Sequence, residues 1–178
     1  DLVDFAAATP MDMPSIQQAT KVLLQFGVTG QDVIPTLRML GDVTGGDAFK
    51  LHSMSLAFGQ MSATGRLMGQ DLLQMINVGF NPLQEIARTS GRSVQELKAE
   101  MEKGGISVDM VKNALKTATS EGGAFFGMME KQSKTLTGLM STMQDDIGGL
   151  LRVLGADIIE GLNLKEVVKQ ISSAVQAI

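Results

Sequence analysis

Residues 69–116 read GQDLLQMINVGFNPLQEIARTSGRSVQELKAEMEKGGISVDMVKNALK, and this stretch decides the predicted fold. It holds three side chains that suit the start of a helix. Asn81 precedes a proline, whose missing N–H costs nothing in a first helical turn. Ser93 stands three residues before Glu96, the spacing of a capping box, in which each side chain binds the other residue's backbone N–H. Ser107 caps the third predicted helix.

Glycines separate these helices. Gly79, Gly91 and the pair 104–105 stand where a glycine commonly ends a helix. The segments 93–101 and 107–115 also share one pattern, namely a serine cap, three apolar residues at helical spacing and an exposed lysine. We therefore predict two short helices that pack on a common core.

Composition predicts a globular chain with an aliphatic core. The 178 residues are 44% hydrophobic and 19% charged, which is typical of a folded domain rather than of a disordered one. Aromatic residues make up only 4%, without tryptophan or tyrosine, whereas methionine occurs 13 times. We expect most of these methionines to fill gaps in the core, since their side chains are flexible.

Charge and cysteine content exclude several classes of protein. The net charge of −4 and the pI near 5.0 disfavour nucleic-acid binding, which needs a basic surface. The absence of cysteine excludes a disulfide framework and thiolate chemistry. The sequence contains no run of 18 apolar residues, so it predicts no membrane-spanning helix. We also expect no signal peptide. Because the chain begins with aspartate, we expect it to be a piece of a longer protein.

Upstream of residue 69, the sequence predicts that residues 1–12 form a loop or the tail of an earlier element, because prolines at 10 and 14 disfavour a helix there. Three helices are predicted to follow. These helices are expected over 14–26, over 29–40 with breaks at Gly41 and at the glycine pair 45–46, and over 47–61 with Asp47 as the cap. Four methionines recur every seven residues, at positions 54, 61, 68 and 75. We favour two separate helices over one continuous methionine seam, because Gly65 and Gly69 interrupt the series.

Downstream of residue 116, residues 120–123 predict a hinge, which is followed by a short helix over about 124–132. A long apolar row at helical spacing then begins near residue 135, and a last helix is expected over 163–178. The predicted fold is all-α, with eight to ten mostly short helices. Residues 1–120 are expected to form a compact lobe. Residues 121–178 are expected to form a helical arm that packs either on the lobe or on a partner.

We find no pattern that predicts a catalytic, cofactor or metal site. His52 is the single histidine and lies mid-helix, so metal-ligand spacing is absent and no serine has an obvious base. Asp145 and Asp146 point about a hundred degrees apart on a helix and cannot easily share one proton. The glycines form neither a dinucleotide-binding fingerprint nor a phosphate-binding loop. The sequence therefore predicts that the chain is not an enzyme.

One alternative is a DNA-binding module, since residues 86–97 fit the pattern of a helix-turn-helix, with a small residue at Ala87 and a turn at Gly91. Arg88 and Arg92 would then contact the phosphates. The second helix would present Arg92, Gln95, Glu96, Ala99 and Glu100 to a groove. Two carboxylates on that face, in a chain of net negative charge, disfavour this interpretation.

The order of these elements resembles the tape measure domain of phage tail tape measure proteins. The matching motifs are a Gly-x-x-Pro turn at 79–82 and a Gly-x-Ser-x-x-Glu-Leu helix at 91–97. They are followed by the family's Gly-x-Ile-Ser turn, for which residues 105–107 are Gly-Ile-Ser. The likeness extends upstream to Thr9 and downstream to Leu139, so it covers nearly the whole chain. Each motif is weak alone, but their order and spacing together are fairly specific.

The resemblance implies a structural protein of a phage or prophage tail, without a cofactor. Such a protein runs along the tail lumen, and its length sets the tail length. Its partners would be the tail tube protein, tail assembly chaperones and other tape measure copies. It would be found in the virion tail lumen, and in the bacterial host cytoplasm during assembly. Some members carry peptidoglycan hydrolase domains, but nothing in residues 1–178 indicates one.

The apolar row of the predicted arm suggests a further expectation, self-association of the chain. Exposed apolar patches of this kind mark interfaces. The residues we expect to pair are Ile147, Leu150, Leu151, Leu154 and Ile158.

Overall fold

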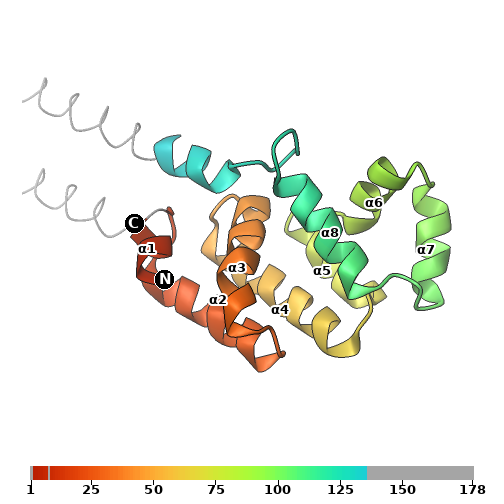
Figure 1. Ribbon diagram of the computed structural model, residues 1–178, viewed down its shortest axis with the longest axis horizontal. Coiled ribbons are helices and arrows are strands. Elements are labelled where there is room, and N and C mark those ends of the chain that lie inside the picture. The colour runs from red at the N-terminus through yellow and green to blue at the C-terminus, as the bar shows by residue number, and fades with distance from the viewer. Residues whose placement is uncertain (1, 8, 136–178) are drawn as a thin grey trace, which may run out of the picture. The chain divides into compact units, whose positions relative to one another are not determined.

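The computed structural model describes residues 2–7 and 9–135, which are helical for most of their length (Figure 1). These residues contain no β-strand, and one isolated β-bridge joins Arg66 to Ser107. The all-α prediction is therefore confirmed. The helices are α1 (Leu2–Ala7), α2 (Met13–Gln25), α3 (Gly30–Thr44), α4 (Ala48–Thr64), α5 (Gly69–Asn77), α6 (Pro82–Ser90), α7 (Val94–Glu102) and α8 (Val108–Thr119), with a further helical stretch over 128–135.

The helices start where the sequence places caps. The Ser93 hydroxyl accepts the backbone N–H of Glu96 at 3.2 Å, and the Glu96 carboxylate accepts the backbone N–H of Ser93 at 2.9 Å. The side chains of Asn81, Asp47 and Ser107 likewise accept N–H groups in the first turns of α6, α4 and α8. The predicted caps are confirmed, because each satisfies donors that the helix itself leaves without a partner.

Removal of the Ser93 hydroxyl should destabilise the protein. We expect Ser93→Ala to lower the free energy of unfolding by about 1 kcal/mol, since an N–H of α7 loses its acceptor. Ser93→Thr keeps the hydroxyl and should remain within about 0.5 kcal/mol of the parent. Urea denaturation of the three proteins checks this, and an unchanged midpoint for Ser93→Ala would show that the cap contributes nothing.

Helix α4 forms the centre of the core. It packs on α2, α3 and α5 (Figure 1), and the side chains of Leu51, Met54, Phe58 and Met61 are fully buried. Met68 lies between α4 and α5 and is 44% exposed. Met54 and Met61 thus belong to α4 and Met75 to α5, so the series is not one continuous seam, as predicted.

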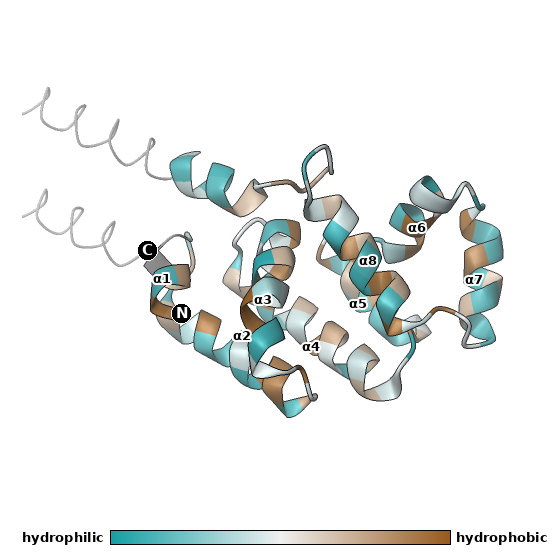
Figure 2. Ribbon diagram, in the orientation of Figure 1, coloured by the Kyte–Doolittle hydropathy of each residue, from teal (hydrophilic) through white to brown (hydrophobic). Residues whose placement is uncertain are grey.

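Helices α6, α7 and α8 complete the lobe. Helix α8 packs on α3 and α6, and α7 packs on α6. Both α7 and α8 carry brown and teal segments, as amphipathic helices do (Figure 2). Leu97 of α7 is fully buried, and so are Val111 and Leu115 of α8. This confirms that Leu97 is a core residue and that both similar helices contribute to one core.

Residues 1–12 were predicted to form a loop or the tail of an earlier element, and the loop is wrong over 2–7. These residues form α1, whose Phe5 is only 2% exposed and lies beneath the guanidinium of Arg38, 5.7 Å from the ring centroid. A proline restricts the residue directly before it and leaves earlier residues free to be helical. Apolar contact of Phe5 with the core then favours the helix.

The break predicted at Gly41 is also wrong, because α3 continues to Thr44 and ends at Gly45, where φ is 62°. Gly41 instead provides space. A Cβ atom at this position would lie 2.7 Å from the sulfur of Met129. The glycine thus makes room for a residue that is distant in the sequence, and no local pattern reveals this.

The segment after α8 belongs to the same compact unit as the helices before it, and this unit ends at Ser133. Phe125 contacts Phe80 edge to face, with ring centroids 6.0 Å apart, and Met129 is buried. The helix expected over 124–132 starts only at residue 128, because Gly127 adopts a φ of 59°. The predicted division at residue 120 stays a prediction, since most of the predicted arm, including the helix over 163–178, lies outside the described residues.

Asp42 caps the helical stretch over 128–135 from a distant part of the chain. Its carboxylate oxygen Oδ1 accepts the backbone N–H of Met129 at 3.1 Å. Burial raises the pKa of the Asp42 carboxyl above its ordinary value of 3.8, although this hydrogen bond partly opposes the shift. Because the folded state holds this proton more tightly than the unfolded state, the group's contribution to stability falls as pH rises from 3.8 through the folded-state pKa.

We therefore expect Asp42→Asn to melt at a higher temperature than the parent at pH 7. The amide keeps an acceptor for the Met129 N–H and has no charge to desolvate. The difference should shrink as the pH is lowered towards 3, where the parent carboxyl is protonated. Asp109→Asn, at an exposed position, serves as the control. A lower melting temperature for Asp42→Asn at pH 7 would show that the charge supports the cap more than burial opposes it.

Candidate functional site

The residues predicted to form a self-association interface, Ile147, Leu150, Leu151, Leu154 and Ile158, lie outside the described residues. The acidic pair at 145–146 lies outside them as well. Within the described part of the chain, the most distinctive surface feature is a groove between α5 and α7, with a volume of about 620 Å³.

Each of the two helices presents one stripe to this groove. From α5 come Gly69, Leu72, Leu73 and Ile76, at the spacing i, i+3, i+4 and i+7 that gathers side chains on one face. From α7 come Val94, Lys98, Met101 and Glu102. Helix α5 packs on α4 whereas α7 packs on α6, so the two walls belong to different parts of the lobe.

The groove has an apolar lining that is partly open to solvent. Leu67, Leu72, Leu83 and Met101 are buried and line its inner part. Met68, Leu73, Ile76 and Val94 are between 40% and 62% exposed. These four make up nearly half of the nine large exposed apolar side chains in the described residues, so the exposed apolar surface is concentrated here.

Cations surround this apolar lining. Arg66, Lys98 and Lys103 line the groove together with a single carboxylate, that of Glu102. All three cations are exposed. None of the three forms an ion pair with another described residue. The groove is therefore locally basic, although the chain as a whole carries a net charge of −4.

Backbone contacts fix one end of the groove. The N–H of Leu67 donates to the carbonyl of Ile106 at 2.9 Å, beside the β-bridge between Arg66 and Ser107. This joins the connection between α4 and α5 to the connection between α7 and α8. The Arg66 side chain lies against Gly104, where a Cβ atom would be 2.7 Å from Nη1. Backbone contacts and packing against Gly104 thus set the position of Arg66 at the groove.

A buried carboxylate holds the first turn of α5. Asp71 is 4% exposed and accepts the backbone N–H of Met68 at 3.1 Å. Burial raises the pKa of the Asp71 carboxyl, and the hydrogen bond from Met68 opposes this shift. The carboxylate thus caps the N-terminus of α5 by binding a backbone N–H of the same segment. It stabilises this wall of the groove and is not a ligand site.

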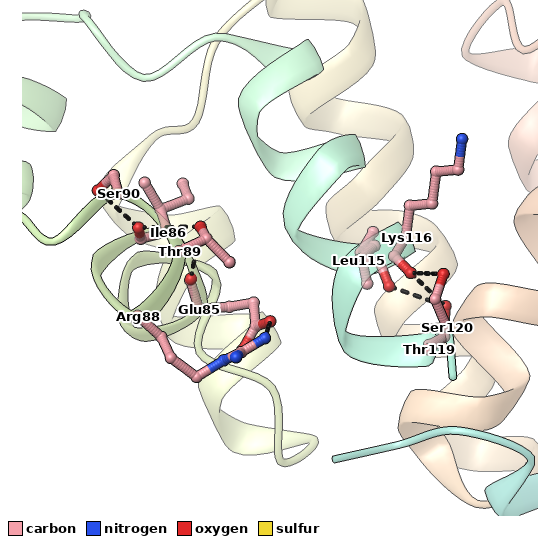
Figure 3. A network of polar contacts seen from close by, with 9 residues as sticks. All are labelled: Glu85, Ile86, Arg88, Thr89, Ser90, Leu115, Lys116, Thr119 and Ser120. Atoms are coloured by element: carbon pink, nitrogen blue, oxygen red, sulfur yellow. Dashed lines mark hydrogen bonds and ion pairs between the residues drawn. The ribbon is translucent and has the colours of Figure 1, made fainter. Parts of the chain in front are cut away.

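The helix-turn-helix pattern corresponds to α6, the turn at 91–93 and α7. Both arginines of this motif are bound by glutamates. Arg88 contacts Glu85 with 2.6 Å between Nη2 and Oε1 (Figure 3), and Arg92 forms an ion pair with Glu100. Phosphates would have to compete with these carboxylates, so the geometry gives no support to DNA binding.

Near the C-terminal ends of α6 and α8, side-chain hydroxyl groups donate hydrogen bonds to backbone carbonyls of the same helix. The hydroxyl groups of Ser90 and Thr119 donate to the carbonyl oxygens of Ile86 and Leu115 at 2.7 and 2.8 Å (Figure 3). Each bond reaches back one helical turn. These contacts are local and structural, and no catalytic group takes part in them.

His52 lies half-buried on α4, and its Nδ1 atom is buried without a hydrogen-bond partner. No group of three or more histidine, cysteine, aspartate or glutamate residues in the described ranges is arranged to hold a metal ion. Among the helices of residues 2–135, none is both long and apolar enough to cross a membrane.

Comparison with known proteins agrees with the resemblance seen in the capping motifs. The model of the tape measure protein family matches residues 1–156, which include every described residue and all of the quoted motifs. Neither a curated protein nor a solved structure matches the chain significantly. Since the match covers most of the 178 residues, the chain belongs to the tape measure protein family, whose members are structural proteins of phage tails.

Proposed function

We propose that this chain, as part of a tape measure protein, sets the length of a phage tail and scaffolds the assembly of the tail tube. The observation that carries the proposal is the family match over residues 1–156. Length measurement needs no reactive group and uses the rise of an extended helical segment, not the packed helices of the compact lobe. A helix rises about 1.5 Å per residue, so the number of helical residues becomes a distance.

The proposed partners follow from this role. Tail tube subunits would polymerise around the protein with the help of tail assembly chaperones, and several copies of the protein would lie together in the tail lumen. During assembly the protein would be in the bacterial host cytoplasm.

The presence of the protein in tails tests this proposal. Tails and heads separated from purified particles can be analysed by mass spectrometry for peptides from residues 2–135. We expect these peptides in the tail fraction. Their confinement to heads, or their absence from both fractions at every stage of assembly, would contradict a role inside the tail.

We further propose that copies associate through Ile147, Leu150, Leu151, Leu154 and Ile158, which repeat at helical spacing in the sequence. Sedimentation of the full chain should show concentration-dependent association, which Leu151→Asp combined with Leu154→Asp should abolish. Thr135→Asp, outside the row, is the control. A parent chain that remains monomeric at high concentration would exclude this interface.

The alternative of a DNA-binding module requires Arg88 and Arg92 to be available to phosphates. An electrophoretic shift with random duplex at low salt distinguishes the two functions, because basic DNA readers bind detectably under that condition. We expect no shift, since both arginines are engaged by glutamates. A shift that Arg92→Ala abolishes would favour the alternative.

A further inference from the structure

The groove between α5 and α7 combines two properties that neither the family match nor the length-measuring role explains. Its lining includes apolar side chains that are left exposed, and its charged residues are mostly cations in a chain that is acidic overall. We propose that this groove binds an amphipathic helix of a partner protein, whose apolar face carries carboxylates at its edges.

The shape of the groove favours a helix as the occupant. Its walls are two helices, and α5 is nine residues long, which corresponds to about 14 Å. A partner helix of about two and a half turns would therefore be covered along its length. Leu73, Ile76 and Val94 would receive the apolar residues of the partner, as in other complexes in which a helix lies in an apolar groove.

The charge of the groove favours acidic edges on that helix. Arg66, Lys98 and Lys103 are exposed and make no ion pair with a described residue. Carboxylates placed beside the apolar face would complement these cations and would exclude basic partners. A nucleic acid would satisfy the cations as well, but it would leave Leu73 and Ile76 without an apolar contact.

The proposal can be tested with two fluorescent synthetic helical peptides that share one leucine face and differ only in flanking residues, glutamate in one and lysine in the other. Anisotropy with the full 178-residue chain should show that the glutamate peptide binds at least about tenfold more tightly. This preference should weaken as salt rises from about 0.05 to about 0.5 M, since ions screen exposed charges.

Variants at exposed positions separate the contributions of the groove. Leu73→Asp should weaken binding of the glutamate peptide by about tenfold or more, and Lys98→Glu should shift the preference towards the lysine peptide. Phe49→Asp is the matched control, because Phe49 is 81% exposed and lies outside the groove. Circular dichroism confirms that each variant remains folded, which is expected because none of the three side chains is buried.

Several results would overturn the proposal. These are a glutamate peptide that does not bind saturably, equal binding of both peptides, and a loss of binding in Phe49→Asp as large as that in Leu73→Asp. If the chain alone self-associates and Leu73→Asp abolishes this association, the occupant is a second copy and the proposed partner is wrong. None of these outcomes bears on whether the protein resides in tails, so the groove and the tail role are tested separately.

Discussion

Replacement of Phe58 by alanine should lower the free energy of unfolding by about 3–5 kcal/mol. Phe58 is fully buried in the middle of α4, the helix that packs on α2, α3 and α5. Truncation removes a whole ring from a fully buried site, so the protein loses both the burial of the ring and the contacts around it. Since small domains are stable by only about 5–15 kcal/mol, this is a large share of the total.

Phe49 provides the matched control for this change. It belongs to the same helix and has the same side chain, but it is 81% exposed. Phe49→Ala should change the free energy of unfolding by no more than about 0.5 kcal/mol. Guanidinium denaturation followed by circular dichroism measures both variants. If Phe58→Ala and Phe49→Ala lower the free energy of unfolding equally, α4 is not the centre of the core.

Leu97→Ala should also have a large effect and lower the free energy of unfolding by about 2–5 kcal/mol. Leu97 is fully buried on α7, a helix of nine residues that packs on α6. A helix this short is not stable alone in water, so it depends on its buried residues for its attachment to the lobe. The loss should therefore appear as unfolding or detachment of α7 at lower denaturant concentration.

Leu73→Ala is the control for the same substitution at the surface. Leu73 is 62% exposed on α5, which is also nine residues long. We expect its effect to stay within about 0.5 kcal/mol. Hydrogen exchange of the α7 amides would show where Leu97→Ala acts. Unchanged protection in α7 would contradict the assignment of Leu97 as the residue that anchors this helix.

The features that the sequence predicted well are those that depend on neighbouring residues. The caps at Asn81, Ser93 and Ser107 bind N–H groups two or three residues away, so their spacing is visible in the sequence itself. The burial of Leu97 follows from helical spacing in the same way. The family resemblance rested on these same motifs, which explains why it was found.

The features that the sequence did not reveal depend on distant residues. Gly41 lies inside α3 and leaves space that the side chain of Met129 occupies, and the backbone N–H of Met129 is bound by Asp42. The helix α1 forms because Phe5 reaches the core. No window of a few residues contains either pair of partners, so propensity alone could not decide between helix and loop at these positions.

The groove is a third feature that no local pattern shows. Leu73 and Val94 belong to helices that are separated in the sequence by α6, and only the packing of α5 on α4 and of α7 on α6 places both at the groove. A pattern of apolar spacing assigns such residues to the core by default. Their exposure, at 62% and 41%, is what distinguishes a binding surface from a core position.

The length of phage tails tests the central claim most directly. In-frame insertion of about 40 helix-forming residues after Ser133, where the compact unit ends, should lengthen the tails by about 60 Å if the protein measures length through helical rise. Electron microscopy of tails from parent and insertion phages gives this value, and a series of insertions should give a straight line. Tails of unchanged length at every insertion would contradict the account.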